Sequence, residues 1–451
     1  MGVAVSNWRL AKAVSLTGNL GVVSGTMLDT VMVRRLQDGD PGGDVRRALA
    51  AFPVPAVAEE ILGRYFRPEG RGGSAYHLLP MYKQRVSAAR QRVTIAANFV
   101  EVFLAKQGHD GSIGINLLTK VQLPTLPSLY GAMLAGVDYV IMGAGIPREI
   151  PGVLDALAEH RPARLRFEVE GLGRDEAEYL DFDPAEFGAT HTALKRPRFL
   201  AVISATSLAT TLARKANGVV NGFIIEGPTA GGHNAPPRGE PRFTQLGEPV
   251  YGEKDAVDLG KIRELGLPFW LAGGAGSPGA LRSALASGAA GVQVGTLFAF
   301  CEESGISPDI RRSVLAAVHA DEASVFTDPL ASPTGYPFKL VRTGPEEEPR
   351  KRVCDLGYLR VAARGSDGKV VYRCSAEPVE TYVAKGGAAA DTEGRRCLCN
   401  GLTATVGLPQ VREHGLEPAI VTSGDDLINL PGFFTEGRTV HAADVVGFLL
   451  R

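Results

Sequence analysis

Short apolar runs alternate along most of the chain with longer segments in which apolar residues recur every three to four positions. Seven of these runs end in polar or glycine-bearing turns and lead into segments of helical periodicity. Short apolar runs separated by helices are typical of parallel strands that are buried on both faces. The pattern therefore predicts seven parallel strands in βαβ units, starting at Leu20, Ser112, Val137, Arg198, Gly222, Pro268 and Gly291.

The helical segments are long enough to cover such a sheet. Apolar positions spaced close to 3.6 residues apart give a helix one apolar face. Residues 165–171 alternate instead between apolar and polar side chains, which predicts an edge strand outside the main series. We predict helices over residues 8–17, 26–37, 44–51, 55–65, 84–107, 126–135, 148–159, 208–216, 255–265, 278–287 and 442–450.

Two architectures accommodate this pattern. A (β/α)₈ or TIM barrel needs eight strands, whereas an open doubly wound sheet tolerates seven. In either case we expect residues 1–340 to form the main domain, with insertions near 38–84 and 160–197. Residues 341–451 have a different sequence pattern. They contain a charged stretch and four cysteines, and their apolar residues show only weak periodicity. We expect them to form a C-terminal elaboration packed on the main domain.

Composition narrows the class of protein. The 48 lysine and arginine residues nearly balance the 49 aspartate and glutamate residues, which argues against nucleic acid or an anionic membrane as a partner. No apolar run reaches the roughly 20 residues needed to span a bilayer. Five cysteines without a secretory signal favour a reducing compartment. We therefore expect a cytoplasmic protein, and a homodimer is compatible with the sequence.

The stretch from Ile224 to Gly239 carries the first candidate catalytic group. An apolar run ends there at Glu226, and a glycine-rich turn then presents His233 directly after Gly232. Enzymes of the α/β class place catalytic groups on loops after the carboxyl ends of strands. Glycine lets the backbone approach a flat or anionic ligand closely, because it has no Cβ. On this stretch alone, a ligand loop and a plain turn are about equally supported.

Two further glycine-bearing turns follow the last two predicted strands. They read LAGGAG over residues 271–276 and VGTLF over residues 294–298. In barrels the loops after the last two strands form a phosphate site, where backbone N–H groups and a helix N-terminus bind the anion. Thr296 adds a hydroxyl donor to the second turn. The two turns together favour a phosphate-bearing cofactor over bare turns.

These motifs, taken in order, resemble those of a known family. The sequence AGGH after a strand, then LAGG, then VQVGT resembles the nitronate monooxygenases, formerly called 2-nitropropane dioxygenases. The same pattern is similar to the FMN-dependent enoyl-acyl carrier protein reductases. The resemblance covers roughly residues 1–340 and includes segments 10–25, 115–117 and 332–339. It implies a TIM barrel that holds FMN, which favours the barrel over the open sheet.

The chain departs from the family pattern at three places. The family's first strand, of the type PIIQGGMG, has no counterpart, because the chain begins at Met1-Gly2. We therefore expect either a start codon upstream or a barrel that lacks its first strand. The glutamine that commonly ends the sixth strand is Glu226 here, and the glycine usual two residues after the histidine is Ala235.

The resemblance also implies a role for each matching residue. His233 would face the flavin ring, with the substrate between them, and Gly232 would lie beside the ring. A neutral imidazole suits proton transfer at a carbon next to a nitro or carbonyl group. The residues that would hold FMN are Ser24, Asn116 and Glu226 along the ribityl chain and ring, and Gly273, Gly274, Gly295 and Thr296 at the phosphate.

Three functions remain open from the sequence. The leading one is FMN-dependent oxidation of alkyl nitronates to carbonyl compounds and nitrite. The second is a trans-acting enoyl reductase of a fatty acid or polyketide synthase, which would use NAD(P)H and take enoyl thioesters from acyl carrier protein. The third is a flavin-free scaffold or binding protein, motivated by the missing first strand. His233 fits both enzymes and does not discriminate between them.

The C-terminal region holds a cluster of cysteines. Cys354, Cys374, Cys397 and Cys399 could supply four thiolates to zinc or to an iron–sulfur cluster. Their spacing lacks the paired C-x₂-C knuckles that characterise such sites. Ordinary buried cysteines are therefore the alternative to a metal site.

Overall fold

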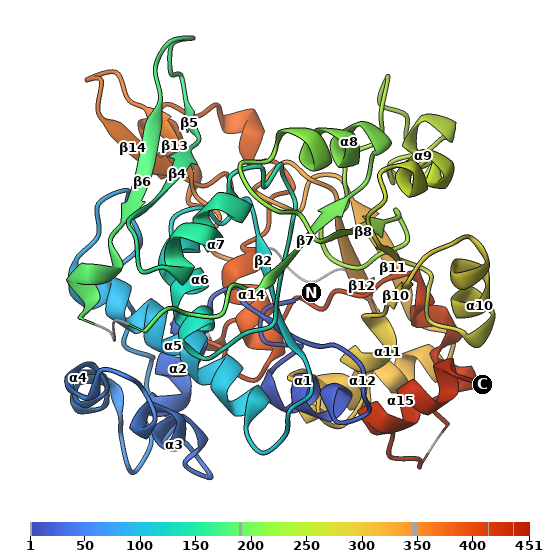
Figure 1. Ribbon diagram of the computed structural model, residues 1–451, viewed down its shortest axis with the longest axis horizontal. Helices are drawn as coiled ribbons and strands as arrows, with labels where there is room; N and C mark the ends of the chain where they lie inside the picture. Colours follow the sequence, from blue (N-terminus) through green and yellow to red (C-terminus); the bar gives the residue numbers. More distant parts are fainter. Residues whose placement is uncertain (1, 189–191, 345–349, 414, 436) are drawn as a thin grey trace.

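Seven parallel strands form a single curled sheet in the computed structural model, which describes residues 2–188, 192–344, 350–413, 415–435 and 437–451 (Figure 1). Each strand pairs with the next along the chain, as in a barrel wall. Their bounds agree with all seven predicted runs: β1 (Gly21–Ser24), β2 (Ile113–Leu118), β3 (Tyr139–Gly143), β7 (Arg198–Ile203), β8 (Gly222–Glu226), β9 (Phe269–Ala272) and β10 (Gly291–Gln293).

Strands β1 and β10 are the two edges of this sheet. Within the described residues no strand pairs with the free side of either one. The predicted α/β class and the seven parallel strands are therefore confirmed, whereas an eight-stranded closure is not seen. The predicted absence of one strand from the barrel agrees with this open sheet.

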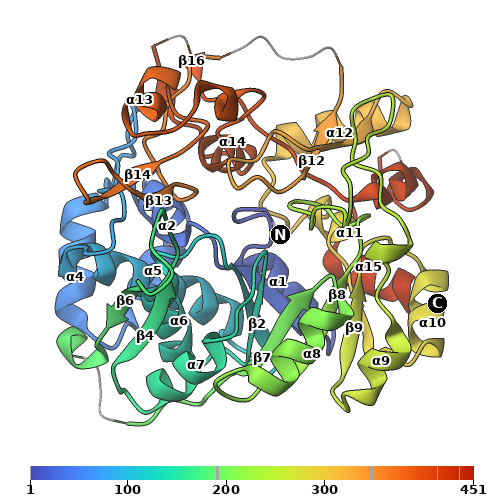
Figure 2. The same ribbon diagram turned by 90° about the horizontal axis from the view of Figure 1, so that it is seen from above.

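The register of the strands separates the side chains into two faces. Phe199, Phe223 and Phe269 lie on the outer face and are almost fully buried against the helices. Ile224 and Ala272 point to the inner face, where they join a small apolar cluster. Figure 2 shows α7 and α8 on one side of the strands and the region around α14 on the other. Both faces are thus covered, which explains the continuous apolar runs in the sequence.

The helices follow the predicted segments closely, and their caps explain the differences. The fifth helix begins at Ala88 rather than at residue 84, because the hydroxyl of Ser87 accepts a hydrogen bond from the Arg90 amide and caps it. The helices on the sheet are α1 (Trp8–Ser15), α2 (Leu28–Gln37), α3 (Asp44–Ala50), α4 (Pro55–Tyr65), α5 (Ala88–Lys106), α6 (Thr125–Leu134), α7 (Ile150–Ala158), α8 (Thr206–Lys215), α9 (Leu259–Glu264), α10 (Pro278–Ala286), α11 (Thr296–Ala299), α12 (Pro308–His319) and α15 (Ala442–Leu449).

The insertion after α7 joins the C-terminal region through a small sheet. The predicted edge strand at 165–171 is divided in two: β4 (Ala163–Phe167) pairs with β6 (Glu178–Phe182), and β5 (Val169–Glu170) pairs with β13 (Val361–Arg364). β13 also pairs with β14 (Val370–Arg373). The insertion and the C-terminal region are therefore hydrogen-bonded to each other.

The C-terminal region also packs on the carboxyl ends of the main strands. Met27 and Phe338 share an apolar cluster there with Tyr358 and Leu398. The antiparallel pair β11 (Ser324–Asp328) and β12 (Phe338–Arg342) leads into this region from the main domain. The region itself also contains α13 (Val379–Ala384), α14 (Leu398–Thr405) and the short pair β15 (Val411–Arg412) and β16 (Gly415–Leu416). Among the helices described, none combines the length and the apolar character that crossing a bilayer requires.

Candidate active site

A cavity opens at the carboxyl ends of the strands on the inner face of the sheet. Its empty space is about 870 Å³, part of which is open to solvent. Three polar side chains project from strand ends into it: Asn116 from β2, Glu226 from β8 and Gln293 from β10. The carboxyl ends of parallel strands are the usual position of ligand sites in α/β folds. This cavity is therefore the candidate active site.

His233 enters the cavity from the loop after β8. The loop is held against β12 by two backbone hydrogen bonds, from Lys339 N to Gly232 O (2.9 Å) and from Asn234 N to Pro337 O (2.9 Å). The imidazole lies edge-on to the ring of Phe338, with ring centroids 4.8 Å apart. A loop histidine held on two sides by a strand has a defined position, unlike the side chain of a free turn.

A buried hydroxyl fixes the orientation of the His233 ring. Ser332 Oγ lies 2.6 Å from His233 Nε2, and Thr334 Oγ1 lies 2.8 Å from the same hydroxyl. Ser332 is fully buried. The Ser332 hydroxyl therefore holds one ring nitrogen and leaves Nδ1 for other contacts.

Loss of hydration shifts the pKa of two titratable groups in the cavity, His233 and Glu226. It lowers the pKa of His233 to about 4 and raises the pKa of Glu226 to about 7. Loss of hydration disfavours the charged form of each group, which explains the opposite directions. At neutral pH His233 is therefore an uncharged imidazole that can accept a proton, and Glu226 exchanges its proton near neutrality.

The predicted cofactor residues separate into two groups. Asn116, Glu226 and Gly232 line the cavity together with His233. Ser24 does not line it: although Ser24 is the register neighbour of Asn116, it is 1% exposed. Its expected contact with a ribityl chain is therefore not supported by the lining of the cavity.

The two glycine turns lie beside the cavity, and the backbone of the first turn requires its glycines. Gly273 and Gly274 adopt the left-handed conformation, with φ values of 91° and 64°. A Cβ on Gly273 would come within 2.8 Å of the Ala230 amide nitrogen, whereas a Cβ on Gly295 would meet open space. Gly274 and Gly295 are both exposed. These turns are compatible with a phosphate group, because two exposed glycines lie at adjacent strand ends, where no side chain blocks an approaching anion.

The two turns with Gly273, Gly274, Gly295 and Thr296 are called the phosphate cradle below. Part of this cradle contacts the C-terminal region. Thr296 Oγ1 accepts a hydrogen bond from the Gly424 amide (3.0 Å), and Asp426 Oδ2 accepts one from the Gly276 amide (3.1 Å). Thr296 is thus engaged with a C-terminal turn, and its hydroxyl hydrogen remains able to donate. Residues 424–426 form one wall of the cradle, which the sequence pattern did not indicate.

The C-terminal region also forms one wall of the cavity. Side chains more than 100 residues from His233 in the sequence line the cavity opposite the strand ends: Tyr358, Leu359, Leu398, Cys399, Leu402 and Thr422. The sequence analysis assigned none of these except Cys399, which it placed in a metal site. It also missed Gln293, although the polar residue in the middle of the VQV run was a usable signal. Phe338, an aromatic residue after the last main strand, lines the cavity too.

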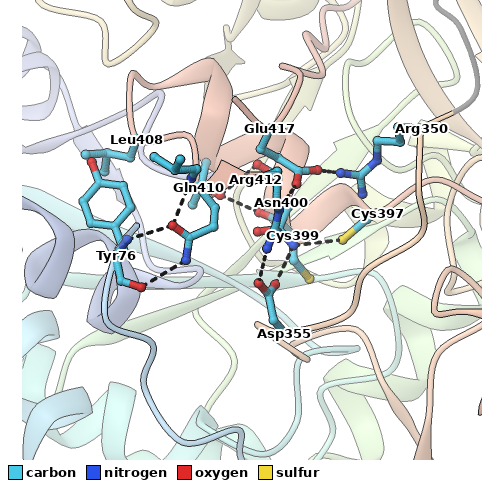
Figure 3. A network of polar contacts seen from close by, with 12 residues as sticks. Tyr76, Arg350, Asp355, Cys397, Cys399, Asn400, Leu408, Gln410, Arg412 and Glu417 are labelled. Atoms are coloured by element: carbon cyan, nitrogen blue, oxygen red, sulfur yellow. Dashed lines mark hydrogen bonds and ion pairs between the residues drawn. The ribbon is translucent and has the colours of Figure 1, made fainter. Parts of the chain in front are cut away.

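A polar network holds α14, the helix that carries Leu398, Cys399 and Leu402 of this wall, in position (Figure 3). Asp355 accepts hydrogen bonds from Asn400 Nδ2 (2.8 Å) and Arg412 Nη1 (2.7 Å), and Arg412 Nε donates to Glu417 (2.8 Å). Gln410 bonds to the backbone of Tyr76 in the first insertion. Because charged groups that are buried together must keep their partners, this network holds Leu398, Cys399 and Leu402 in place.

The four C-terminal cysteines lie close enough to affect one another's ionisation. A hydrogen bond with Cys374 lowers the pKa of Cys354, and burial raises the pKa of Cys399. Among the described residues, no group of three or more histidine, cysteine, aspartate or glutamate side chains could hold a metal ion. The predicted zinc or iron–sulfur site at Cys354, Cys374, Cys397 and Cys399 is therefore not supported. Three of the four are buried thiols.

Known proteins were compared with the chain in three ways. Residues 185–331 match the family model described as nitronate monooxygenase. A comparison with curated proteins found no match. Among solved structures, FabK from Thermotoga maritima has 15% identity, with 99% of this chain and 88% of that chain covered and a TM-score of 0.48.

Two further solved structures are similar to the chain. The nitroalkane oxidase from Streptomyces ansochromogenes has 14% identity, with 100% of this chain and 92% of that chain covered and a TM-score of 0.48. The enoyl reductase domain of MlnA from Bacillus amyloliquefaciens has 13% identity over 56% of this chain and 55% of that chain, with a TM-score of 0.32. At these identities and scores the similarities carry no argument about activity.

The stretch that matches the family model builds one part of the candidate site. It spans β7 to β10, the His233 loop and both glycine turns. The predicted resemblance to the nitronate monooxygenase family is therefore confirmed over residues 185–331.

Proposed function

We propose that the chain is an FMN-dependent oxidoreductase that oxidises alkyl nitronates, with dioxygen, to carbonyl compounds and nitrite. One observation carries this choice: His233, the only histidine that lines the cavity among the described residues, is half-buried there, where loss of hydration lowers its pKa and favours the neutral imidazole. A neutral imidazole removes a proton from the carbon next to a nitro group, which converts a nitroalkane into its nitronate. The family match over residues 185–331 supports the same chemistry.

The glycine turns would hold the cofactor. Gly273, Gly274, Gly295 and Thr296 would bind the phosphate of FMN through backbone amides and one hydroxyl. Asn116, Glu226 and Gly232 would then lie along the ribityl chain and the ring, since they line the cavity next to these turns. When bound, FMN supplies the electron acceptor for the nitronate. In this arrangement the seven strands act as the wall of a TIM-type barrel.

The role of the protein is to orient the substrate and to move one proton. Ser332 holds His233 Nε2, so that Nδ1 is the nitrogen that would take the proton from the substrate carbon. Apolar side chains of the C-terminal wall, Leu359, Leu398 and Leu402, would receive the alkyl group and exclude water. Glu226, which exchanges its proton near neutrality, would hold or release a proton beside the substrate.

A second candidate is reduction of an enoyl thioester with NAD(P)H. The apolar C-terminal wall favours it, because Leu359, Leu398 and Leu402 would also accommodate an acyl chain delivered by an acyl carrier protein. In that reaction His233 would have to donate a proton to carbon. A histidine with a pKa of about 4 is rarely protonated at neutral pH, so we rank this function second.

A pair of substrates tests the proposed role of His233. After reconstitution with FMN, nitrite release is measured with a neutral nitroalkane and with its preformed nitronate. His233→Ala should lower kcat/KM for the nitroalkane by roughly 100-fold or more, because general base catalysis contributes about that much. The preformed nitronate needs no proton removed, so its rate should fall far less.

The matched control is His319→Ala, which removes an exposed histidine at the end of α12. It should leave both rates unchanged. Equal losses on the two substrates in His233→Ala would contradict a base role for His233. A reconstituted wild-type protein that releases no nitrite from either substrate would contradict the proposed function itself.

A further inference from the structure

A carboxylate of the C-terminal region lies at the phosphate cradle. Asp426, near the start of the short 3₁₀ helix Asp425–Gly432, accepts a hydrogen bond through Oδ2 from the backbone amide of Gly276 (3.1 Å). Gly276 comes two residues after Gly274 in the first turn and directly precedes Ser277, which caps α10. Backbone amides of such turns are the groups that bind a phosphate. Asp426 therefore takes one of the amides that this turn can offer to an anion.

Glycine at position 276 admits the carboxylate. A Cβ on Gly276 would come within 2.8 Å of Asp426 Oδ2 and within 2.6 Å of Leu297 Cδ1. Gly276 is not among the glycines in the left-handed region, so the close approach, and not its own backbone conformation, requires a glycine here. The contact with Asp426 is thus part of the construction of the first turn.

The segment that carries Asp426 is anchored on both sides. Gly424, two residues before it, donates its amide to Thr296 Oγ1 in the second turn (3.0 Å). Leu427, directly after it, is fully buried in an apolar cluster that also contains Leu297 of α11. Asp426 lies between these two anchors, which keep its carboxylate at the cradle.

The charge of Asp426 has no basic partner among the residues that the structure describes. Its other contact is with the neutral side chain of Asn429. The adjacent Asp425 is paired instead with Lys339, whose Nζ lies 2.7 Å from Asp425 Oδ1. Burial, together with the charge of Asp425, raises the pKa of Asp426. The surroundings of this carboxylate therefore disfavour negative charge, both its own and that of an anion placed beside it.

A phosphate bound in the cradle would face this carboxylate. Like charges a few ångströms apart repel each other most strongly where water is partly excluded, and a phosphate monoester carries nearly two negative charges above pH 7. A neutral hydroxyl in the same place would meet no such repulsion and could donate to the carboxylate. FMN and riboflavin differ in this one group, since riboflavin ends in a hydroxyl where FMN carries the phosphate.

We propose that Asp426 determines how strongly the site selects a phosphorylated ligand: its carboxylate opposes a phosphate in the cradle and lowers the preference for FMN over riboflavin. That a cofactor phosphate binds in this cradle rests on the proposed function. The site then holds FMN less tightly than the amides and the hydroxyl of the cradle alone would hold it. The direction of the effect follows from the position and the charge of Asp426.

Two flavins and one isosteric substitution test this role without turnover. Flavin-free protein is titrated with FMN and with riboflavin at pH 8, well above the ordinary aspartate pKa of about 3.9, and the change in flavin fluorescence gives both dissociation constants. Asp426→Asn keeps an acceptor for the Gly276 amide and removes the charge. The ratio of Kd for riboflavin to Kd for FMN should rise about ten-fold, as expected when one charge is removed several ångströms from a dianion in a partly solvated site.

Three further variants control this experiment. Asp426→Glu keeps the charge and should leave the ratio close to that of wild type. Asp426→Ser removes the charge with a shorter side chain; it should raise the ratio in the same direction and gives a test even if Asp426→Asn fails to fold. Asp175→Asn removes an exposed carboxylate in the insertion after α7 and should preserve the ratio.

A ratio that stays unchanged or falls in Asp426→Asn and Asp426→Ser, or that rises equally in Asp175→Asn, would overturn the proposal. The absence of FMN binding in wild type and in every variant would overturn it too, and would also contradict FMN as the cofactor. Because binding is measured without substrate, nitronate oxidation is a separate outcome. If the ratio rises as expected and nitronates are not oxidised, the role of Asp426 stands and the proposed function fails.

Discussion

Two titratable residues of one cavity are moved in opposite directions by the same cause. Burial makes the neutral forms of His233 and Glu226 more stable, so that the pKa of the first falls to about 4 and that of the second rises to about 7. Titratable pairs whose pKa values are shifted in this way commonly divide the roles of acid and base. Here the imidazole is the base at every pH near neutrality.

The pH dependence of nitroalkane oxidation should report the His233 pKa. A base must be unprotonated, so kcat/KM for a neutral nitroalkane should stay level down to about pH 5. Below that it should fall, with an apparent pKa of about 4. A steady-state pH profile with a nitroalkane measures this. A fall centred near 6.5, the ordinary pKa of histidine, would show that the imidazole is not buried during catalysis.

Glu226→Gln should change stability in a pH-dependent manner. The folded-state pKa of Glu226 lies above its unfolded value of 4.5. The contribution of the protonated Glu226 to the free energy of unfolding is therefore fully present below pH 4.5 and is lost as pH rises through 7. Glutamine does not titrate. The variant should therefore gain about 1–2 kcal/mol relative to wild type between pH 5 and pH 9, allowing for partial solvent contact.

Urea unfolding at pH 5, 7 and 9 measures this gain for Glu226→Gln. Glu59→Gln, on the exposed face of α4, is the control for the change of side chain. A difference between Glu226→Gln and wild type that stays constant across these pH values would show that the pKa of Glu226 is not raised in the folded protein.

At the scale of helices and strands, the sequence was sufficient to predict the seven strands of the main sheet. Each main strand is a short apolar run because helices and the inner cluster bury both of its faces, and this burial is what the pattern records. Element ends were less predictable. The start of α5, for example, depends on one capping hydroxyl, Ser87.

The candidate site could be predicted only in part. Residues next to strand ends, such as Asn116, Glu226 and His233, follow from the strands themselves. Tyr358 and Leu398 reach the cavity through packing and hydrogen bonds between distant segments, which leave no local pattern. The packing of the four C-terminal cysteines has the same origin, and it could not be read from their spacing along the chain.

The packing of α5 against α6 depends on one glycine. A Cβ on Gly131 of α6 would lie 2.1 Å from the backbone oxygen of Ile95 of α5, and the backbone of a buried helix cannot yield cheaply. Gly131→Ala should therefore destabilise the protein by about 1–3 kcal/mol. Thermal unfolding or urea unfolding measures the loss.

Gly63→Ala is the matched control for this prediction. Gly63 is also helical, in α4, but a Cβ there would meet nothing within 4 Å. This substitution should stabilise the protein by about 0.5–1 kcal/mol, because alanine favours the helix. Similar effects of the two substitutions would contradict the close contact of α5 and α6.

At the scale of the whole molecule, the cavity is assembled from distant parts of the chain. Val3 near the start, the carboxyl ends of the strands, and Thr422 in the C-terminal region all line it. The phosphate cradle is likewise completed by residues 424–426. The C-terminal region is thus part of the site, although its charge and weak periodicity suggested only an elaboration of the main domain.

The central claim is that this cavity oxidises nitronates through FMN. The most direct test follows the visible absorbance of FMN-reconstituted protein under anaerobic conditions, with a nitronate or with NADPH as the only added reagent. We expect the nitronate to bleach the flavin without any pyridine nucleotide, and NADPH alone to leave it oxidised. Bleaching by NADPH but not by nitronate would contradict the claim in favour of the enoyl reductase, and failure to retain FMN would contradict both.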